Sequence, residues 1–216
     1  MLDDLVLFID GEAIVIDKPA GLPVDRPRDR SPSIAGRLDE LTFGFQRFPT
    51  AVHRLDRDTS GCLLLARNPK AHARFQQAFE AGLVQKRYVA VLDGIPAETS
   101  GTIDLPLGKV STIEEGWRMV GDPKGKAART NWKLLRTDGD RALVAFFPET
   151  GRTHQIRVHA AEGLGTPVLG DPVYGNGGHA MLLHAAQLTV PRGNKPPIEA
   201  TAPLPPSFAA AGFGDS

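Results

Sequence analysis

The residues best suited to chemistry lie in three short polar segments of the chain. The first runs from His53 to Gly61, the second from Lys86 to Tyr88, and the third from Gly151 to His159. Each of them adjoins an apolar run. Because loops attached to rigid strands commonly hold catalytic and binding groups, we take these three segments as the candidate site.

In the first segment a carboxylate stands between two arginines. Arg54 precedes Asp56 by two residues and Arg57 follows it directly, before a Thr-Ser-Gly sequence. A nearby guanidinium favours the ionised carboxylate, which is the form that a nucleophile or an electrostatic catalyst needs. The pattern also fits a structural interpretation, in which Asp56 caps the turn and Arg54 pairs with it at the surface. The pattern alone leaves both interpretations open.

Other kinds of catalytic site fit the sequence poorly. His154 and His159 are five residues apart, unlike the four-apart pair of a zinc-binding helix, and Cys62 is the single cysteine. No serine lies in a Gly-x-Ser-x-Gly elbow, and the sequence has no glycine-rich phosphate or dinucleotide loop. We therefore expect no metal site and no serine nucleophile.

The elements that must position the three segments follow from the apolar pattern. A hairpin with a tight turn at Asp10-Gly11 is predicted from Leu5 to Asp17, and apolar spacing predicts a helix over Ser33 to Phe43. Asn68 as a cap, Pro69 and Gly82 predict a helix over residues 69–81. Further strands are predicted near residues 51–53, 62–66, 84–92, 127–135, 141–147 and 198–202, the last at a sheet edge, and a short helix over 151–162.

This order of elements indicates the fold class. Strands outnumber helices and do not alternate with them regularly, so we predict an α+β fold with a mixed, largely antiparallel central sheet flanked by helices. The length of 216 residues, with 41% apolar and 23% charged residues, is typical of one globular domain covering residues 1–216. The lone cysteine and the absence of a signal-peptide pattern lead us to expect a cytoplasmic protein, and no apolar run is long enough to cross a membrane.

The net charge is zero, but the charges are unevenly distributed. Residues 118–136 carry six basic side chains and one acidic side chain, with Trp132 among them and Trp117 just before. Such a stretch could form a basic surface that contacts nucleic acid. It could equally be a solvated hairpin whose indoles pack inward.

Taken together, the motifs resemble those of the RluA-type family of RNA pseudouridine synthases. The family signature His-Arg-Leu-Asp-x-x-Thr-Ser-Gly is matched without departure by residues 53–61. The Lys-Pro-x-Gly and Lys-x-Tyr-x-Ala motifs are matched at residues 18–21 and 86–90, and the Gly-Arg-Thr-His-Gln-Ile-Arg-Val-His motif at 151–159. The matches of residues 167–171, 174–175 and 183–185 follow in the same order, so the resemblance covers nearly the whole chain.

The resemblance implies a reaction and a set of roles. The chain would isomerise uridine in structured ribosomal or transfer RNA to pseudouridine, after the target base leaves the helix, without a cofactor or a metal. Asp56 would be the nucleophile, Arg157 its partner, Tyr88 the aromatic against the target base, and Arg54 the residue that helps to fill the vacated position. Substrate contacts are also expected from Lys18, Lys86, Arg152, His154, Ile156 and Leu183.

Several of these roles have plain structural alternatives. Lys18 could contact phosphate or simply be solvated, and Tyr88 could be an ordinary strand aromatic in the core. We expect His154 and His184 to orient Asp171 or backbone carbonyls. Ile156 could line the site or only fill the core, and the same holds for Leu183. Whether Asp56 attacks the base at C6, attacks the sugar at C1′ or first helps to remove a sugar proton is left open.

The resemblance also bears on partners. Many family members carry a separate N-terminal RNA-binding domain, whereas here the catalytic pattern begins near residue 5, so we expect none. The expected partner is structured RNA, with no obligatory protein partner and a monomeric state. An RNA-binding module that performs no chemistry is the alternative function.

Overall fold

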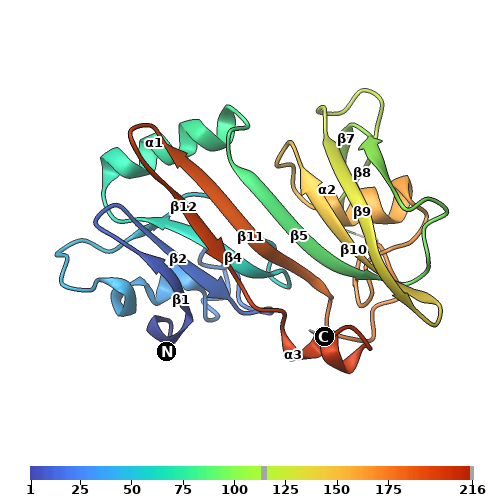
Figure 1. Cartoon of the computed structure of the whole chain (residues 1–216), viewed down its shortest axis with the longest axis horizontal. Helices are drawn as coiled ribbons and strands as arrows, with labels where there is room; N and C mark the ends of the chain where they lie inside the picture. The colour runs from blue at the N-terminus through green and yellow to red at the C-terminus, as the bar shows by residue number, and fades with distance from the viewer. Residues whose placement is uncertain (113–115, 215–216) are drawn as a thin grey trace. The chain divides into compact units, whose positions relative to one another are not determined.

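The computed structural model has an α+β fold and describes residues 1–112 and 116–214 (Figure 1). The chain forms two compact units, each with its own core. Unit 1 comprises Met1–Lys86 and Ala185–Pro203, and unit 2 comprises Arg87–His184 and Leu204–Ser216. The predicted class, α+β with a largely antiparallel sheet, is confirmed. The single domain over residues 1–216 stays a prediction.

Unit 1 is built on antiparallel strands and one helix. Strand β2 pairs with β1 on one side and with β4 on the other, β3 also pairs with β4, and β12 pairs with β11. The bounds are β1 Val6–Ile9, β2 Ala13–Lys18, β3 Thr50–Ala51, β4 Ser60–Ala66, α1 Pro69–Glu80, β11 Leu183–Arg192 and β12 Lys195–Thr201. The first two residues of β11 belong to unit 2, so this strand runs from one unit into the other.

Helix α1 confirms the prediction from its capping residues. The Asn68 side chain accepts a hydrogen bond from the Ala71 amide at 2.8 Å, and Gly82 ends the helix with a φ of 68°. One face of the helix is buried through Ala71, Phe75 and Ala78 and packs in the core of unit 1. The other core residues include Val15, Val52, Leu64, Leu188, Val190 and Ile198.

Two local predictions in unit 1 are wrong. The β1–β2 hairpin exists, but its turn is made by Asp10, whose Oδ1 accepts hydrogen bonds from the amides of Glu12 and Ala13 at 2.8 and 2.9 Å. Gly11 therefore does not supply the left-handed backbone of a primed turn.

The predicted helix over Ser33 to Phe43 is replaced by two short 3-10 turns, Ile34–Gly36 and Leu38–Leu41. The Ser33 side chain accepts a hydrogen bond from the Gly36 amide, and the backbone leaves the helical region at Arg37. A glycine in the middle of so short a segment disfavours continuous helix, so apolar spacing alone misled here.

Unit 2 contains a second set of antiparallel strands, with a separate hairpin and short helices. Strand β10 lies between β5 and β9, β9 also pairs with β6, and β7 pairs with β8. The bounds are β5 Gln85–Leu92, β6 Ser100–Asp104, β7 Leu107–Thr112, β8 Gly116–Gly121, β9 Arg129–Asp138, β10 Arg141–Pro148, α2 Gln155–Val158 and α3 Pro206–Ala210, with a π-helical turn at His159–Gly163 after α2. The short helix predicted over 151–162 is confirmed by α2 and this turn.

The core of unit 2 lies between the strands and the α2 segment. Ala90 of β5, Val144 and Phe146 of β10 and Ile156 of α2 are all buried there. Trp132 of β9 packs into the same core and is only 6% exposed. One of the two indoles of the basic stretch therefore points inward, as the solvated-hairpin interpretation expects.

Cys62 is buried in unit 1. Its thiol lies 3.7 Å from the carbonyl oxygens of Ala186 and Ala200. Burial raises the pKa of this thiol to about 12. The thiolate is therefore scarce at neutral pH, and the cysteine is a small core residue. Among the residues described, no helix has the length and apolar character needed to span a membrane.

Candidate active site

The Asp56 loop is short and is fixed to a buried strand. Leu55 before the aspartate is buried, and Thr59 and Ser60 after it are buried where the chain enters β4. The Thr59 amide donates a hydrogen bond to the Asp56 carbonyl at 3.2 Å, which closes the turn. Asp56 itself is half-buried. The Asp56 carboxylate is thus carried by a loop whose ends, at Leu55 and Thr59, are both buried.

Lys18 lies beneath this loop and is completely buried. Its ammonium donates to three carbonyl oxygens, those of Pro19 at 2.9 Å, Leu22 at 2.8 Å and Arg57 at 3.0 Å. All three donors of the ammonium are therefore used within the protein. The prediction that Lys18 contacts phosphate or is solvated is wrong, because its ammonium connects the loop to the end of β2.

The charge of Lys18 is affected by its position. Burial lowers the pKa of Lys18 to about 8, although the negative charges of Asp58 and Asp56 oppose this shift. The side chain therefore stays mostly protonated at neutral pH and adds a buried positive charge close to the loop.

The Lys-Pro-x-Gly motif makes a second connection to the loop. The Gly21 amide donates to the Arg57 carbonyl at 2.9 Å, and the Arg57 Nε donates to the Gly21 carbonyl at 3.1 Å. The Arg57 carbonyl thus accepts from both Lys18 and Gly21. Residues 18–21 consequently position the Asp56 loop, a function that the motif alone did not reveal.

Gly61 explains why a glycine ends the signature segment. It has a φ of 105°, a conformation that side chains rarely adopt. A Cβ at this position would collide with the carbonyl oxygen of Ala185 on β11. The backbone of β11 can therefore lie this close to the start of β4 only because residue 61 is a glycine.

His53 begins the segment as a structural residue. Its Nε2 accepts a hydrogen bond from the Leu64 amide at 3.1 Å, and its ring stacks on Phe79 of α1 at 4.7 Å between centroids. Burial and, to a lesser extent, the positive charge of Lys86 lower the pKa of His53 to about 4. The imidazole is therefore neutral near pH 7. Burial also lowers the pKa of Lys86, which is half-buried at the start of β5.

Arg54 is at the surface and has an acidic partner other than Asp56. Its Nη1 lies 3.1 Å from Oδ2 of Asp25, and the two side chains are 78% and 59% exposed. The expected surface pair of Arg54 with Asp56 is thus replaced by a pair with Asp25. Exposed pairs of this kind are weak, so the guanidinium can exchange its partner.

In unit 2, Gln155 fixes the third segment to β9. Its Oε1 accepts from the Thr150 hydroxyl at 2.7 Å and the Arg152 amide at 2.9 Å, and its Nε2 donates to the Thr130 hydroxyl at 2.9 Å. The same Thr130 hydroxyl lies 2.8 Å from Nδ1 of buried His159. These contacts fix the orientation of α2 and therefore the position of Arg157 on it.

Arg157 forms a buried ion pair with Asp171. Its Nε and Nη2 each lie 2.7 Å from a carboxylate oxygen of Asp171, and the two side chains are 6% and 0% exposed. Burial by itself would raise the pKa of Asp171, but Arg157 and the amides of Val173 and Tyr174 outweigh it, so the pKa is lowered. This two-point pair fixes the guanidinium plane. Arg157 thus orients Asp171, and the expectation that His154 and His184 orient Asp171 or backbone carbonyls stays a prediction.

His154 points toward the β7–β8 hairpin. It adopts a left-handed backbone conformation, with φ 54°, just before α2. Its Nδ1 lies 2.9 Å from the Tyr174 hydroxyl, and its ring stacks with Trp117 at 5.3 Å between centroids. Tyr174 also accepts a hydrogen bond from the Met119 amide at 3.0 Å. The histidine thus joins the α2 segment to the hairpin.

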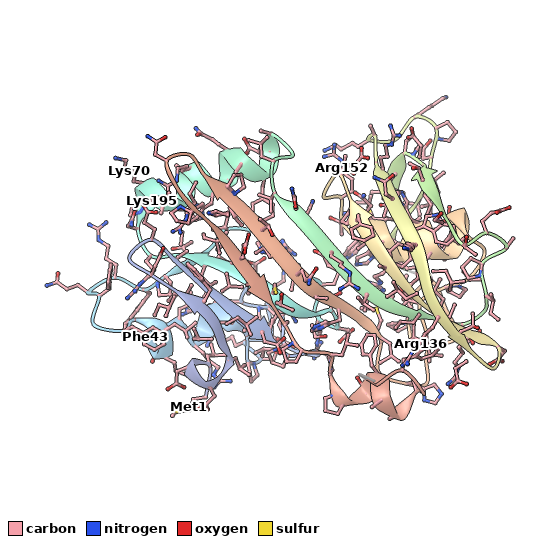
Figure 2. All side chains as sticks on the ribbon, in the orientation of Figure 1. Met1, Phe43, Lys70, Arg136, Arg152 and Lys195 are labelled. Carbon is pink, nitrogen blue, oxygen red and sulfur yellow. The ribbon has the colours of Figure 1, made fainter. Side chains whose placement is uncertain are left out.

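The remaining predicted residues of unit 2 differ in exposure. Arg152 is exposed and donates from Nε to the Ala127 carbonyl at 3.0 Å (Figure 2). Tyr88 is half-buried and packs against the core that contains Ile156 and Leu183. These two apolar residues thus fill the core, one of the two expectations for them. His184 is fully buried, with its ring edge-on to Phe208 at 6.2 Å.

Within each unit the structure brings part of the predicted site together. Unit 1 groups the Asp56 loop with Lys18, and unit 2 groups Arg157 with His154. The pairing of Arg157 with Asp56 stays a prediction. Asp171 and Tyr174 were not among the site residues predicted from sequence, and Trp117 was considered only with the basic stretch that could contact nucleic acid. The Asp-Pro-Val-Tyr-Gly stretch at 171–175, polar residues in a segment rich in Gly and Pro, was the available signal.

The side chains considered as metal ligands are engaged elsewhere. His53 accepts from a backbone amide, and His159 contacts the Thr130 hydroxyl and, at 3.0 Å, the Leu105 carbonyl. Over residues 1–112 and 116–214, no three His, Cys, Asp or Glu side chains form a group suited to a metal ion.

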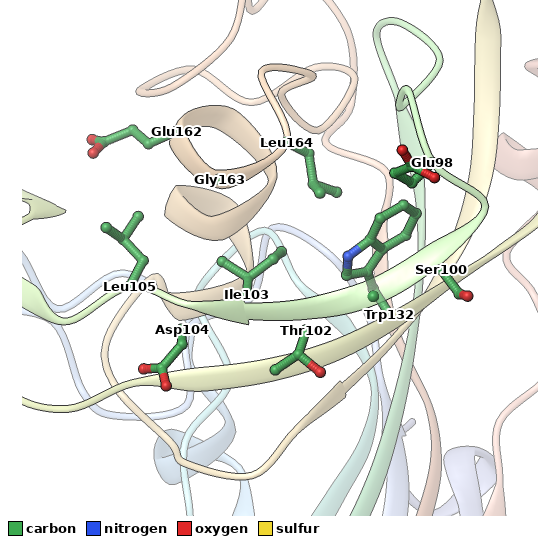
Figure 3. Close-up of a pocket in the computed structure, with 11 residues that line it drawn as sticks. Glu98, Ser100, Thr102, Ile103, Asp104, Leu105, Trp132, Glu162, Gly163 and Leu164 are labelled. Atoms are coloured by element: carbon green, nitrogen blue, oxygen red, sulfur yellow. The ribbon is translucent and has the colours of Figure 1, made fainter.

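Unit 2 also has an open cavity of about 440 Å³ (Figure 3). It lies along β6 and the turn after α2, and the indole of Trp132 and Ile103 contribute to its lining. Its lining also includes the carboxylates of Glu98, Asp104 and Glu162. None of the predicted site residues lines it. Because three carboxylates would repel a phosphate backbone, this cavity does not suit RNA.

Comparison with known proteins gives a consistent family. Residues 12–162 match the family model described as RNA pseudouridylate synthase. The chain is 58% identical over 212 residues to an uncharacterized RNA pseudouridine synthase of Zymomonas mobilis, covering 96% of this chain and 97% of that protein. It is 35% identical over 204 residues to ribosomal large subunit pseudouridine synthase D of the same organism, covering 85% of this chain and 63% of that protein. The solved structure of human RNA pseudouridylate synthase domain containing 4 is similar, with a TM-score of 0.82 and 27% identity, covering 96% of this chain and 91% of that chain.

Proposed function

Because the chain belongs to the RNA pseudouridylate synthase family, whose members isomerise uridine in RNA, we propose that it modifies a specific uridine of a structured RNA with Asp56 as the nucleophile. The reaction breaks the bond between N1 of uracil and C1′ of the ribose. The base turns, C5 bonds to C1′, the C5 proton is released and N1 is protonated. The product is an isomer of the substrate, so no external oxidant or reductant is consumed.

The fixed Asp56 loop is the observation that carries this proposal. A nucleophile must be held in place while the base turns, because small displacements of reacting groups cost large factors in rate. Lys18 and Gly21 both hold the Arg57 carbonyl, and Thr59 closes the turn from the other side. The backbone carbonyls of Asp56 and Arg57 are thus both held by hydrogen bonds.

The basic residues beside Asp56 support an RNA substrate. Arg54 and Arg57 flank the carboxylate, and Arg54 has only an exposed partner. We propose that Arg54 leaves Asp25 and enters the position that the flipped uridine vacates. Lys86 and Arg152 would contact the phosphate backbone, which is the usual role of cations on an RNA-binding face.

Unit 2 would supply the groups that face the target base. We propose that Tyr88 lies against the uracil and that Arg157 pairs with Asp56, its guanidinium plane being fixed by Asp171. Because bases of every kind stack on an aromatic ring, Tyr88 can hold the uracil while it turns. We propose that His154 supports RNA binding by holding Trp117 and Tyr174 in place.

Ribosomal RNA is the substrate class that we favour. A relative with 35% identity is named a ribosomal large subunit pseudouridine synthase, and this similarity motivates the choice. Mapping pseudouridines in total RNA from cells with and without the protein tests it. Loss of a ribosomal position supports the proposal, and loss of a transfer RNA position alone contradicts the substrate class.

The Asp56→Asn variant tests the nucleophile. We expect tritium release from RNA labelled at C5 of uridine to be abolished, while the fold is retained. Asp58→Asn is the matched control, because it makes the same change two residues away, and we expect it to keep most of its activity. Turnover by Asp56→Asn would refute the nucleophile. Wild-type protein that binds RNA but forms no pseudouridine would instead indicate the RNA-binding module.

A further inference from the structure

Trp117 differs from the other tryptophan of the chain. Trp132 is buried in the core of unit 2, whereas Trp117 on β8 is 50% exposed. A single exposed aromatic residue is common on protein surfaces, so exposure alone carries no conclusion. The surroundings of the indole give the further evidence.

The indole is held by contacts with two other residues. The His154 ring stacks with it, at 5.3 Å between centroids and an angle of 27° between planes. The ammonium of exposed Lys109, on the neighbouring strand β7, lies 5.1 Å from the indole centroid. An indole held in this way loses little conformational freedom when a ligand stacks on it.

The hairpin that carries Trp117 is fixed to the α2 segment. The Met119 amide donates to the Tyr174 hydroxyl at 3.0 Å, and the Gly121 amide donates to Oε2 of Glu162 at 2.8 Å. Alternate residues of β8, at positions 117, 119 and 121, thus contact His154, Tyr174 and Glu162 in turn. The strand that carries the exposed indole is therefore held in place by hydrogen bonds on the C-terminal side of Trp117.

The contacts continue from Trp117 to Arg157. The His154 ring stands edge-on to Tyr174, at 5.6 Å between centroids, and the Arg157 guanidinium lies 5.1 Å from the Tyr174 centroid. Arg157 is in turn held by Asp171. A row of stacked and charged groups, which we call the Trp117 row, thus joins a surface indole to Arg157 of the motif in residues 151–159.

We propose that Trp117 and Lys109 form a subsite for one unpaired nucleotide of the RNA substrate. The base would stack on the indole, and the Lys109 ammonium would move from the ring to the adjoining phosphate. Aromatic side chains accept every base in this way, so the subsite would favour unpaired structure rather than a particular sequence. This inference rests on the proposed function and adds a second point of contact with the same RNA.

The charge around the indole favours RNA over a protein partner as the ligand. Two cations of unit 2 are exposed in this part of the chain. Lys109 is on β7, and Arg152 precedes His154 of the Trp117 row by two residues. Phosphate groups pair well with such cations, whereas the base supplies the flat surface that an indole binds. One nucleotide contains both groups.

Tryptophan fluorescence gives a direct test, because the chain has two tryptophans and only Trp117 is exposed. The probe is an RNA hairpin with a uridine-rich loop, and the comparison is a blunt duplex of the same stem. Both are titrated into full-length Asp56→Asn protein, which prevents turnover. We expect the loop RNA to quench the fluorescence and the duplex to quench it much less. Trp117→Phe in the same background should lose the quenching, because buried Trp132 remains as an unresponsive control.

Affinity for the loop RNA gives the second measurement. Trp117→Ala should weaken binding about tenfold or more, and Trp117→Phe should restore most of it, because phenylalanine can still stack. Phe147→Ala, which removes another exposed aromatic residue of unit 2, should have little effect. Lys109→Ala should reduce the salt dependence of binding by about one charge.

The outcomes are distinguishable. Loop RNA that binds without quenching, or with the same affinity for Trp117→Ala, overturns the subsite. This is also the result expected if the indole were covered by a protein partner instead. Tritium release by the wild-type protein is measured in parallel. Its absence counts against the proposed function, whereas release without quenching counts against the subsite alone.

Discussion

The ammonium of Lys18 lies 3.0 Å from the carbonyl oxygen of Arg57, the residue that follows Asp56. A buried cation thus holds the backbone of the loop that carries the proposed nucleophile, without being placed to contact RNA. The first motif and the signature motif, more than thirty residues apart in sequence, are therefore parts of one structure.

Replacing Lys18 by methionine should impair catalysis through the position of Asp56. Three carbonyl oxygens would lose the ammonium as a donor, and only that of Arg57 would keep the Gly21 amide. Because buried groups left unsatisfied are costly, we expect the free energy of unfolding to fall by about 3 kcal/mol. We expect kcat to fall at least about tenfold because the carboxylate is displaced, with a smaller change in KM for RNA.

Chemical denaturation and steady-state kinetics measure the two effects. Lys70→Met is the matched control, because Lys70 is exposed on α1 (Figure 2) and its loss should change neither quantity appreciably. Unchanged stability and kcat in Lys18→Met would show that the buried ammonium does not hold the loop.

Replacing Asp25 by asparagine should strengthen RNA binding. The change frees the Arg54 guanidinium from its exposed partner and removes a negative charge beside it. We expect the dissociation constant at low salt to fall by roughly two- to fivefold, because exposed ion pairs are weak and phosphate binding depends on charge.

Binding to the same RNA at several salt concentrations checks this expectation. Asp39→Asn serves as the control, since it removes one exposed carboxylate of unit 1 away from Arg54, and it should have a smaller effect. Equal effects of the two substitutions would show that only net charge matters and that the release of Arg54 contributes nothing.

The neutral state of His53 should make the protein less stable in acid. The pKa of His53 is lowered to about 4 in the folded protein, against about 6.5 in an unfolded chain. Above pH 6.5 the imidazole is neutral in both states, so its contribution to stability is complete. Between pH 6.5 and 4 the unfolded chain binds a proton that the folded protein does not, and the free energy of unfolding falls by at most about 1.4 kcal/mol per pH unit.

The variant His53→Gln isolates this contribution. Glutamine can accept the hydrogen bond from the Leu64 amide but does not titrate in this range. Carboxyl groups with a lowered pKa, such as Asp171, stabilise the folded state less as the pH falls. Their contribution to the unfolding free energy is the same in both proteins, so it cancels in the difference. The difference in unfolding free energy between wild type and variant should therefore shrink as the pH falls. A difference independent of pH would contradict the neutral, buried imidazole.

The sequence predicted the elements that have strong local signals. The caps at Asn68 and Gly82 located α1 to within one residue, and alternation located β5 and β10 almost as well. Strand β11 was not predicted, because His184 and Pro191 interrupt its apolar sequence, although residues 186–192 alternate between buried and more exposed positions in the structure. Its place is determined by pairing with distant strands, which local patterns do not report.

The site was predictable as a set of motifs but less so as a set of contacts. The polar segments identified Asp56, Arg157 and His154, since residues of these types beside strands are informative. Spacing did not reveal that Lys18 is buried or that Asp171 holds Arg157. Both facts depend on which chain segments fold against each other, over 39 and 14 residues of sequence.

The buried position of Cys62 makes the chain convenient for spectroscopic labelling. A thiol with a pKa of about 12 reacts slowly with maleimides at neutral pH, so the natural cysteine need not be removed. A cysteine introduced on an exposed residue of each unit, such as Lys70 and Lys133, would take a dye or a spin label selectively. Such a doubly labelled protein would report any change in the distance between the two labels when RNA is added.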